Sequence, residues 1–458
     1  MSGTSGTDTD GLPPPQRYWA ITTLALGIAM AVLDSAIANV ALPTIAKDLN
    51  ATPADSIWVV NAYQLVITVL MLPLASLGEI VGYRRVYRVG LVVFTLASLG
   101  CSLSHSLGML SAARVMQGVG AAGMLSVNGA LVRYIYPSRL LGRGIGINAL
   151  VVAVSAAVGP TVAAGILSIA SWPWLFAVNV PIGIATLAAA RMLPRTPRSG
   201  RRFDLSSALL NALFFGLLII GVDSVGHGGF SLYVALAFVV AALSGVALVM
   251  RQLPQTSPLL PVDLLRIPIF ALSIATSVCS FAAQMLAYVS IPFYFQDLLG
   301  RSDVATGLLM TPWPLATAVV APIAGRLADR HSAGLLGALG LVIFAAGLGL
   351  LALLPAVPSD ADIVWRMALC GAGFGLFQSP NNRVIITSAP RERSGGASGM
   401  LGTARLLGQT VGAALMALMF SLFGGRATVW ALGLAAGIAL LAAAVSYTRL
   451  VETFRAKG

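Results

Sequence analysis

An acidic residue lies deep within the first long apolar stretch of this sequence. Asp34 stands roughly 15 residues into the run, or roughly 22 Å along a helix. An ionised carboxylate at such a depth in a bilayer costs about 2.5–3.5 kcal/mol, so it must face water, pair with another helix or carry a proton. A carboxyl group that exchanges a proton for a cation provides the minimal chemistry of a proton/cation exchanger. The alternative is a structural role, in which Asp34 locks its helix to a neighbour.

Two other apolar runs carry residues that membrane helices tolerate only for a reason. Arg114 and Gln117 lie three residues apart within 107–132, so they share one helix face. An arginine inside a membrane helix needs a counter-charge or carbonyl oxygens, which makes this pair a candidate for proton coupling or for a structural polar clamp. In a later run, Gly159 and Pro160 predict a kinked and closely packed helix that could take part in gating.

Aromatic, thioether and amide side chains in the apolar runs could line a cavity for flat cations. Each cation–π contact contributes about 0.5–2 kcal/mol. Gln284 and Tyr288 lie one helical turn apart, so their run has one partly polar face. Packing or contact with lipid is the alternative for each residue. The candidates are Asn39, Trp58, Tyr63, Phe281, Gln284, Met285, Tyr288, Trp313, Phe377, Gln378 and Asn381.

Two short gaps between apolar runs place an acid close to arginines. Glu79 precedes Arg84 and Arg85, and Asp329 precedes Arg330, within similar patterns of small residues and leucine. Charge pairs that form in one conformation and separate in another bias the equilibrium between the two. We therefore expect these residues to gate the protein, or else to act only as topology signals.

Motifs of other chemistries do not occur in the sequence. It has no GxxxxGK[ST] phosphate loop, no HExxH motif and no GxSxG motif. The three histidines are far apart, and the three cysteines lie singly inside apolar runs. We expect neither an enzyme nor a metal site, and no cofactor; the proton-motive force would drive the protein.

The composition is that of a membrane protein. Hydrophobic residues make up 57% of the chain, charged residues only 10%, and the mean hydropathy is +0.88. Soluble proteins carry about 25% charged residues. The net charge of +12 resides mostly in short gaps without interleaved aromatics, which argues against nucleic acid as a partner. Fourteen runs have the length of a membrane helix: 18–43, 56–77, 85–104, 107–132, 142–169, 172–190, 205–225, 230–250, 268–296, 304–324, 333–355, 363–387, 397–423 and 428–449.

The positive charges indicate the orientation of these runs. If the N-terminus is cytoplasmic, the outer gaps contain only Lys47, Arg301, Arg366 and Arg426, while arginines crowd the inner gaps. Both termini are therefore predicted to be cytoplasmic. The similar acid–arginine gaps indicate two parallel six-helix repeats separated by an inserted helix pair. The predicted segments are a disordered tail (1–17), a first bundle (18–190), a basic linker with two inserted helices (191–267), a second bundle (268–450) and a tail (451–458).

These motifs resemble the fourteen-helix drug:proton antiporters of the major facilitator superfamily, the group that includes quaternary-ammonium and methyl-viologen exporters. The stretch from Leu33 to Pro43 resembles that group's first-helix motif. Arg114, Gln117 and Gly118 match the superfamily's Arg-x-x-Gln-Gly motif, and the region around Gly159 resembles its antiporter motif. Ala75, Glu79 and Ser332, among others, depart from the family pattern but keep its size or charge.

The resemblance implies a proton-coupled exporter of lipophilic or quaternary cationic drugs that works by alternating access. We expect a monomer in the bacterial inner membrane, with small cations, protons and the lipid bilayer as its partners. Export of a native metabolite, such as an amino acid, a polyamine or a siderophore, is one alternative. An uptake symporter and a membrane protein without transport activity are the others.

Overall fold

The computed structural model describes residues 11–137, 140–196, 198, 203–228, 231–253, 262–328, 330–355, 357–389 and 394–455, and all their regular secondary structure is helical. The first half contains α1 (Pro14–Asp48), α2 (Pro53–Ser56), α3 (Trp58–Val81), α4 (Tyr83–Ser102), α5 (Leu107–Ile135), α6 (Leu141–Leu167), α7 (Pro173–Ala177) and α8 (Asn179–Ala189). Then follow α9 (Leu205–Gly228) and α10 (Leu232–Gln252). The second half contains α11 (Pro268–Phe293), α12 (Asp303–Met310), α13 (Pro312–Leu327), α14 (Ala333–Ala352), α15 (Asp360–Ser388), α16 (Ser394–Phe423) and α17 (Ala427–Arg455).

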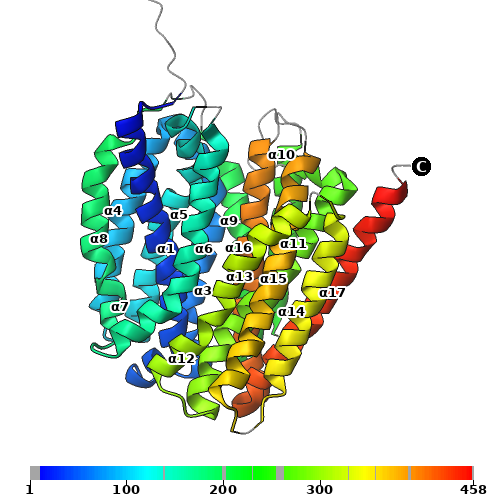
Figure 1. The fold of residues 1–458 in the computed structure, drawn as a ribbon. Helices are drawn as coiled ribbons and strands as arrows, with labels where there is room; N and C mark the ends of the chain where they lie inside the picture. The colour runs from blue at the N-terminus through cyan, green and yellow to red at the C-terminus, as the bar shows by residue number, and fades with distance from the viewer. Residues whose placement is uncertain are drawn as a thin grey trace, which may run out of the picture.

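The two halves repeat one packing arrangement. In the first half α1 packs on α6 and α8, while α5 packs on α3 and α4. In the second half α11 packs on α16 and α17, while α15 packs on α13 and α14. Figure 1 shows the halves side by side, with the start of α1 and the end of α17 at the same end of the molecule.

Matching glycines make the tightest contact of each half possible. A Cβ atom on Gly120 of α5 would lie 2.3 Å from the backbone nitrogen of Phe94 in α4. A Cβ atom on Gly373 of α15 would lie 2.4 Å from the nitrogen of Phe344 in α14. Only glycine allows two helices to approach this closely, so the repeat extends to single residues.

The pair α9 and α10 lies at the seam between the halves. Helix α10 packs against α9, and α9 packs against both α3 and α16. The amide of Asn211 in α9 donates a 2.8 Å hydrogen bond to the carbonyl of Val69 in α3. The inserted helices are thus attached to the seam through α9.

Polar contacts join the two halves at the end of the molecule where α12 lies (Figure 1). Lys47 in the last turn of α1 forms an ion pair of 2.9 Å with Asp297, and Thr44 donates a 2.8 Å hydrogen bond to Asp303 of α12. The hydroxyl groups of Thr161 and Thr311 lie 2.8 Å apart. This is the predicted outer end, so the halves are in contact there.

Eleven helical stretches among the described residues are long and apolar enough to cross a membrane. One of them, Gly399–Arg449, covers both α16 and α17, whereas the apolar part of α9 is shorter and the charged α15 is not among the eleven. The chain is therefore an all-helical, multi-pass membrane protein, while the count of fourteen crossings and the cytoplasmic termini remain predictions. The run 304–324, predicted as one helix, is divided at Thr311 into α12 and α13, because Pro312 supplies no backbone N–H there.

Candidate functional site

Asp34 is buried among donors from two other helices. One carboxylate oxygen accepts hydrogen bonds of 2.8 Å from the amide of Gln117 in α5 and of 2.8 Å from the amide of Asn179 in α8. The other oxygen forms a short ion pair with the guanidinium of Arg114 in α5. A deep carboxylate can face water, pair with another helix or carry a proton, and in this structure Asp34 pairs with other helices. We call Asp34, Arg114, Gln117 and Asn179 the carboxylate cluster.

Arg114 is held on all sides by the first half. It donates a 2.8 Å hydrogen bond to the carbonyl of Val59 and a 2.6 Å hydrogen bond to Gln117. Its guanidinium carbon lies 4.2 Å from the ring centre of Tyr63 and 5.6 Å from that of Phe176. One guanidinium nitrogen, Nη2, has no hydrogen-bond partner within the described part of the chain. A buried donor without a partner is costly, so this nitrogen is available to a ligand or to a rearranged carboxylate.

Helix packing explains how these residues meet. Arg114 and Gln117 share a face of α5, and Gly118 follows them. A Cβ atom on Gly118 would lie 2.8 Å from the carbonyl oxygen of Tyr63, so its absence lets α3 approach α5. On the α4 side, Gln117 donates a 2.9 Å hydrogen bond to Ser98. The motif therefore acts as both a packing and a polar element.

In the sequence, Asp34 is a candidate by itself and Arg114 and Gln117 are a candidate pair, and the structure places all three in one cluster. Asn179 and Ser98 were not among the predicted site residues. An asparagine within the apolar run 172–190 is itself a signal, because a buried amide requires a partner. Ser98 gave no such signal, because serine is common in membrane helices and can bond its own backbone, as it does to Phe94 at 2.8 Å.

Aromatic rings form a continuous cluster in the second half. The ring of Trp313 lies edge-to-face on Tyr288 at 5.9 Å and on Phe344 at 5.5 Å. Phe344 in turn contacts Phe374 at 5.6 Å. We call the set of Phe281, Tyr288, Trp313, Phe344, Phe374 and Phe377 the aromatic cluster. The indole nitrogen of Trp313 is buried without a hydrogen-bond partner in the described residues.

Four cavity candidates belong to this cluster, and the others are spread more widely. Met285 packs in the same hydrophobic core as the rings. Trp58, Gln284 and Gln378 are half-buried. Asn39 is buried, and its amide donates a 3.1 Å hydrogen bond to the carbonyl of Ser35.

Asn381 belongs to a separate buried polar group rather than to the aromatic cluster. Its amide donates a 2.8 Å hydrogen bond to Ser277, and its carbonyl accepts a 2.5 Å hydrogen bond from Arg449 of α17. Arg449 also bonds Ser273 at 2.9 Å. These contacts join α11, α15 and α17, so Asn381 serves packing of the second half in this conformation.

The gating candidates lie in three places. A Cβ atom on Gly159 would lie 2.5 Å from Ala36 of α1, and the carbonyl of Pro160 lies against Gly307 of α12 in the other half. This places the glycine–proline pair at the seam. Glu79 is exposed at the end of α3.

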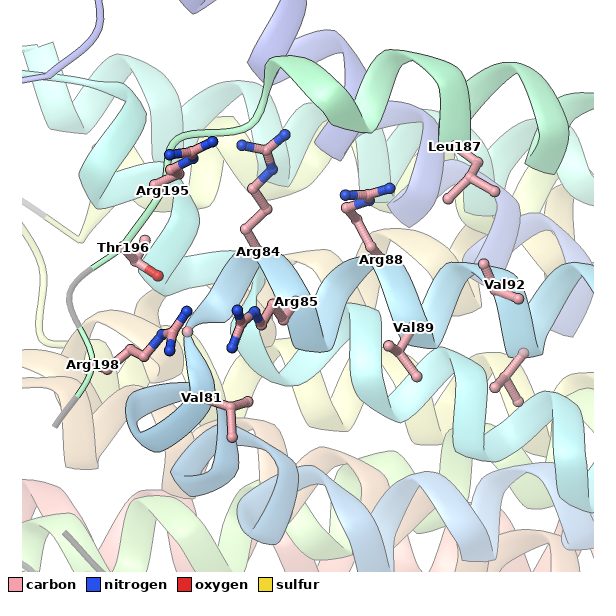
Figure 2. A pocket seen from close by; sticks show the side chains of 12 residues that line it. Val81, Arg84, Arg85, Arg88, Val89, Val92, Leu187, Arg195, Thr196 and Arg198 are labelled. Atoms are coloured by element: carbon pink, nitrogen blue, oxygen red, sulfur yellow. The ribbon is translucent and has the colours of Figure 1, made fainter. Parts of the chain in front are cut away.

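Arg84 donates a 2.7 Å hydrogen bond to the carbonyl of Arg191, and both Arg84 and Arg85 face a surface pocket (Figure 2). Arg330 is exposed, and Asp329 lies outside the described residues. The described residues contain no group of three or more His, Cys, Asp or Glu side chains that could hold a metal ion.

Comparison with known families gives a match over most of the chain. The family model described as "Major Facilitator Superfamily" matches residues 24–405 and, in a second match, residues 272–456. A solved structure of a POT family transporter in complex with a thioalcohol-conjugated peptide superposes with a TM-score of 0.73 at 13% identity, covering 95% of this chain and 96% of that one.

Similar curated proteins are transporters. The chain is 63% identical over 97% of its length to the "Uncharacterized transporter YebQ" of Escherichia coli, of which it covers 98%. It is 31% identical to the "Riboflavin transporter RibZ" of Clostridioides difficile, with 89% of each chain covered. It is 32% identical to the "Multidrug resistance protein Stp" of Mycobacterium tuberculosis, over 87% of this chain and 75% of the relative.

Proposed function

Because the chain belongs to the Major Facilitator Superfamily, whose members are transporters and not enzymes, we propose that it exports lipophilic cations in exchange for protons. The observation that carries this proposal is the carboxylate cluster. Asp34 is buried, yet its partners are side chains, which can rearrange. Such a carboxylate can be protonated and deprotonated as its partners move.

Protonation of Asp34 would change the cluster in a defined way. The neutral carboxyl group loses most of its attraction for Arg114. The guanidinium still donates hydrogen bonds to the carbonyl of Val59 and to the side-chain oxygen of Gln117. A buried arginine that loses its counter-charge favours any rearrangement that supplies another. Proton binding would therefore shift the equilibrium between two packings of α1 against α5.

The aromatic cluster is our candidate for cargo contact. Its rings lie on α11, α13, α14 and α15, and Tyr288 and Gln284 present half-buried surfaces on α11. Electron-rich ring faces attract flat organic cations without requiring a fixed hydrogen-bond pattern. This fits broad selectivity, and a relative of this chain bears the name multidrug resistance protein.

Alternating access would use the seam between the halves. We propose that the contacts of Lys47, Thr44 and Thr161 close the outer end in this conformation, and that Glu79 and Asp329 with their nearby arginines close the inner end in the other. Fourteen crossings, both termini in the cytoplasm and a bacterial inner membrane complete the proposal.

The test is dye transport in inside-out vesicles that contain the full-length protein. Ethidium and methyl viologen should accumulate on energisation, and a proton uncoupler should abolish the accumulation. Asp34→Asn should insert normally but fail to accumulate either compound. Asp360→Asn, which removes an exposed acid paired with Arg301, is the matched control and should retain transport. Wild-type accumulation by Asp34→Asn would exclude the carrier role.

A second candidate is a native metabolite with a flat ring system. The relative named riboflavin transporter is 31% identical to this chain, and an isoalloxazine ring could stack on the aromatic cluster without a positive charge. The same vesicles assayed with labelled riboflavin distinguish the two. Saturable riboflavin movement without accumulation of ethidium or viologen would favour the metabolite.

A further inference from the structure

A pocket rich in arginine opens on the side of the first half, away from both the carboxylate and the aromatic clusters. It measures about 740 Å³ and lies between the start of α4, the end of α8 and the segment after it. Five arginines line it: Arg84, Arg85, Arg88, Arg195 and Arg198. The lining residues include no acid. Figure 2 shows the guanidinium groups of Arg84, Arg88 and Arg195 gathered on one side of α4.

The walls of this arginine pocket are held together by hydrogen bonds. The backbone N–H of Tyr83 donates to the hydroxyl of Thr196 at 3.0 Å, and Arg84 donates to the carbonyl of Arg191 at 2.7 Å. Gly82 joins α3 to α4 with a φ of 100°, a value that favours glycine. The segment after α8 is thus fixed against α4, and five like charges are held near each other. Such an arrangement is unfavourable unless an anion occupies it.

Apolar side chains continue from the pocket along the same face of α4. Arg85, Arg88, Val89, Val92 and Leu96 follow one another at helical spacing, so they form one stripe. Val89 and Leu96 are each 64% exposed. The stripe changes from charged to apolar over about one turn, as at a boundary between lipid headgroups and acyl chains.

We propose that the arginine pocket binds the phosphate headgroup of an anionic phospholipid, with an acyl chain lying along the α4 stripe. A soluble phosphate would use the arginines but not the exposed valines and leucine, whereas a lipid uses both. Five guanidinium groups exceed what one phosphodiester needs, so a lipid with two phosphates, such as diphosphatidylglycerol, fits best. The end of α4 that carries the pocket is predicted to be cytoplasmic, where anionic lipids attract basic segments.

Native mass spectrometry of the detergent-purified full-length protein tests the proposal. Diphosphatidylglycerol should bind at lower concentration than phosphatidylglycerol, and phosphatidylethanolamine should bind weakest. The variant Arg88→Gln/Arg195→Gln should bind diphosphatidylglycerol about thirtyfold more weakly, since each arginine near a lipid surface contributes about 1 kcal/mol. Arg326→Gln/Arg426→Gln removes two exposed arginines of the second half and should bind as the wild type does.

Equal lipid binding by the pocket variant and the wild type would overturn the proposal. Displacement of the lipid by millimolar inorganic phosphate would also overturn it, in favour of a soluble oxyanion. Hydrogen–deuterium exchange on the wild type gives a readout that does not depend on the folding of a variant. Added diphosphatidylglycerol should protect residues 81–96 and 187–196, and unchanged exchange there would contradict the assignment.

Discussion

Replacing Arg114 by methionine would leave the charge of Asp34 buried without its main partner. The equivalent position of the second half, in α15, is Met367, which is fully buried. The repeated helix packing therefore has room for a methionine side chain at this position. Gln117 and Asn179 would still donate to the carboxylate. Removing one partner of a buried ion pair typically costs about 3–5 kcal/mol, because the remaining charge stays desolvated. We expect Arg114→Met to lower the free energy of unfolding by about this amount at neutral pH.

A double-mutant cycle separates this effect from lost packing. Asp34→Asn combined with Arg114→Met removes both charges, so the double variant should be more stable than Arg114→Met alone. Thermal unfolding in detergent, measured for the wild type and the three variants, provides the data. Losses that simply add in the double variant would refute the reasoning.

Three further predictions concern helix packing, cargo contact and gating. Gly120→Ala should lower the free energy of unfolding by about 1–3 kcal/mol, seen as a lower melting temperature, because the new methyl group would lie 2.3 Å from the nitrogen of Phe94. Gly129→Ala, with open space around it, should leave the melting temperature unchanged. Trp313→Ala should weaken the binding of ethidium to the purified protein about two- to thirtyfold, and Trp313→Phe should weaken it less. Glu79→Gln should increase the separation of spin labels on the inner ends of α3 and α14 and slow turnover without weakening ligand binding; an unchanged distance distribution would leave Glu79 as a topology signal.

The sequence predicted an all-helical, multi-pass membrane protein with polar residues inside its apolar runs, because both features follow from the energetics of a bilayer. Apolar runs of membrane length can be recognised from composition, and so can a charged residue inside such a run. Asp34 and Arg114 could therefore be recognised individually. Their pairing could not, since it depends on the rotation of α1 and α5 about their axes, which is set by glycine contacts with α3 and α4.

Side-chain environments were harder to predict where residue type is ambiguous. Tyr63 and Trp313 were both candidates for cargo contact, and their carbonyls meet the equivalent glycines, Gly118 and Gly371. Yet the ring of Tyr63 lies against the guanidinium of Arg114, while Trp313 packs edge-to-face against other rings. An aromatic residue in an apolar run predicts burial but does not reveal its partner, because the hydrophobic effect has no direction.

The difference between the halves bears on how coupling could work. Both halves use one backbone arrangement, but the first places Arg114 and Gln117 where the second places Met367 and Cys370. If the carboxylate cluster binds the proton and the aromatic cluster binds the cation, as proposed, the two ligands cannot compete directly at one atom. They would have to be coupled through contacts between the halves, and α1 makes such a contact, because it carries Asp34 and also packs against α11. Movement of α1 on protonation would then alter α11, whose Tyr288 and Phe281 belong to the aromatic cluster. Coupling in this protein is therefore expected to depend on the α1–α11 contact as much as on Asp34 itself.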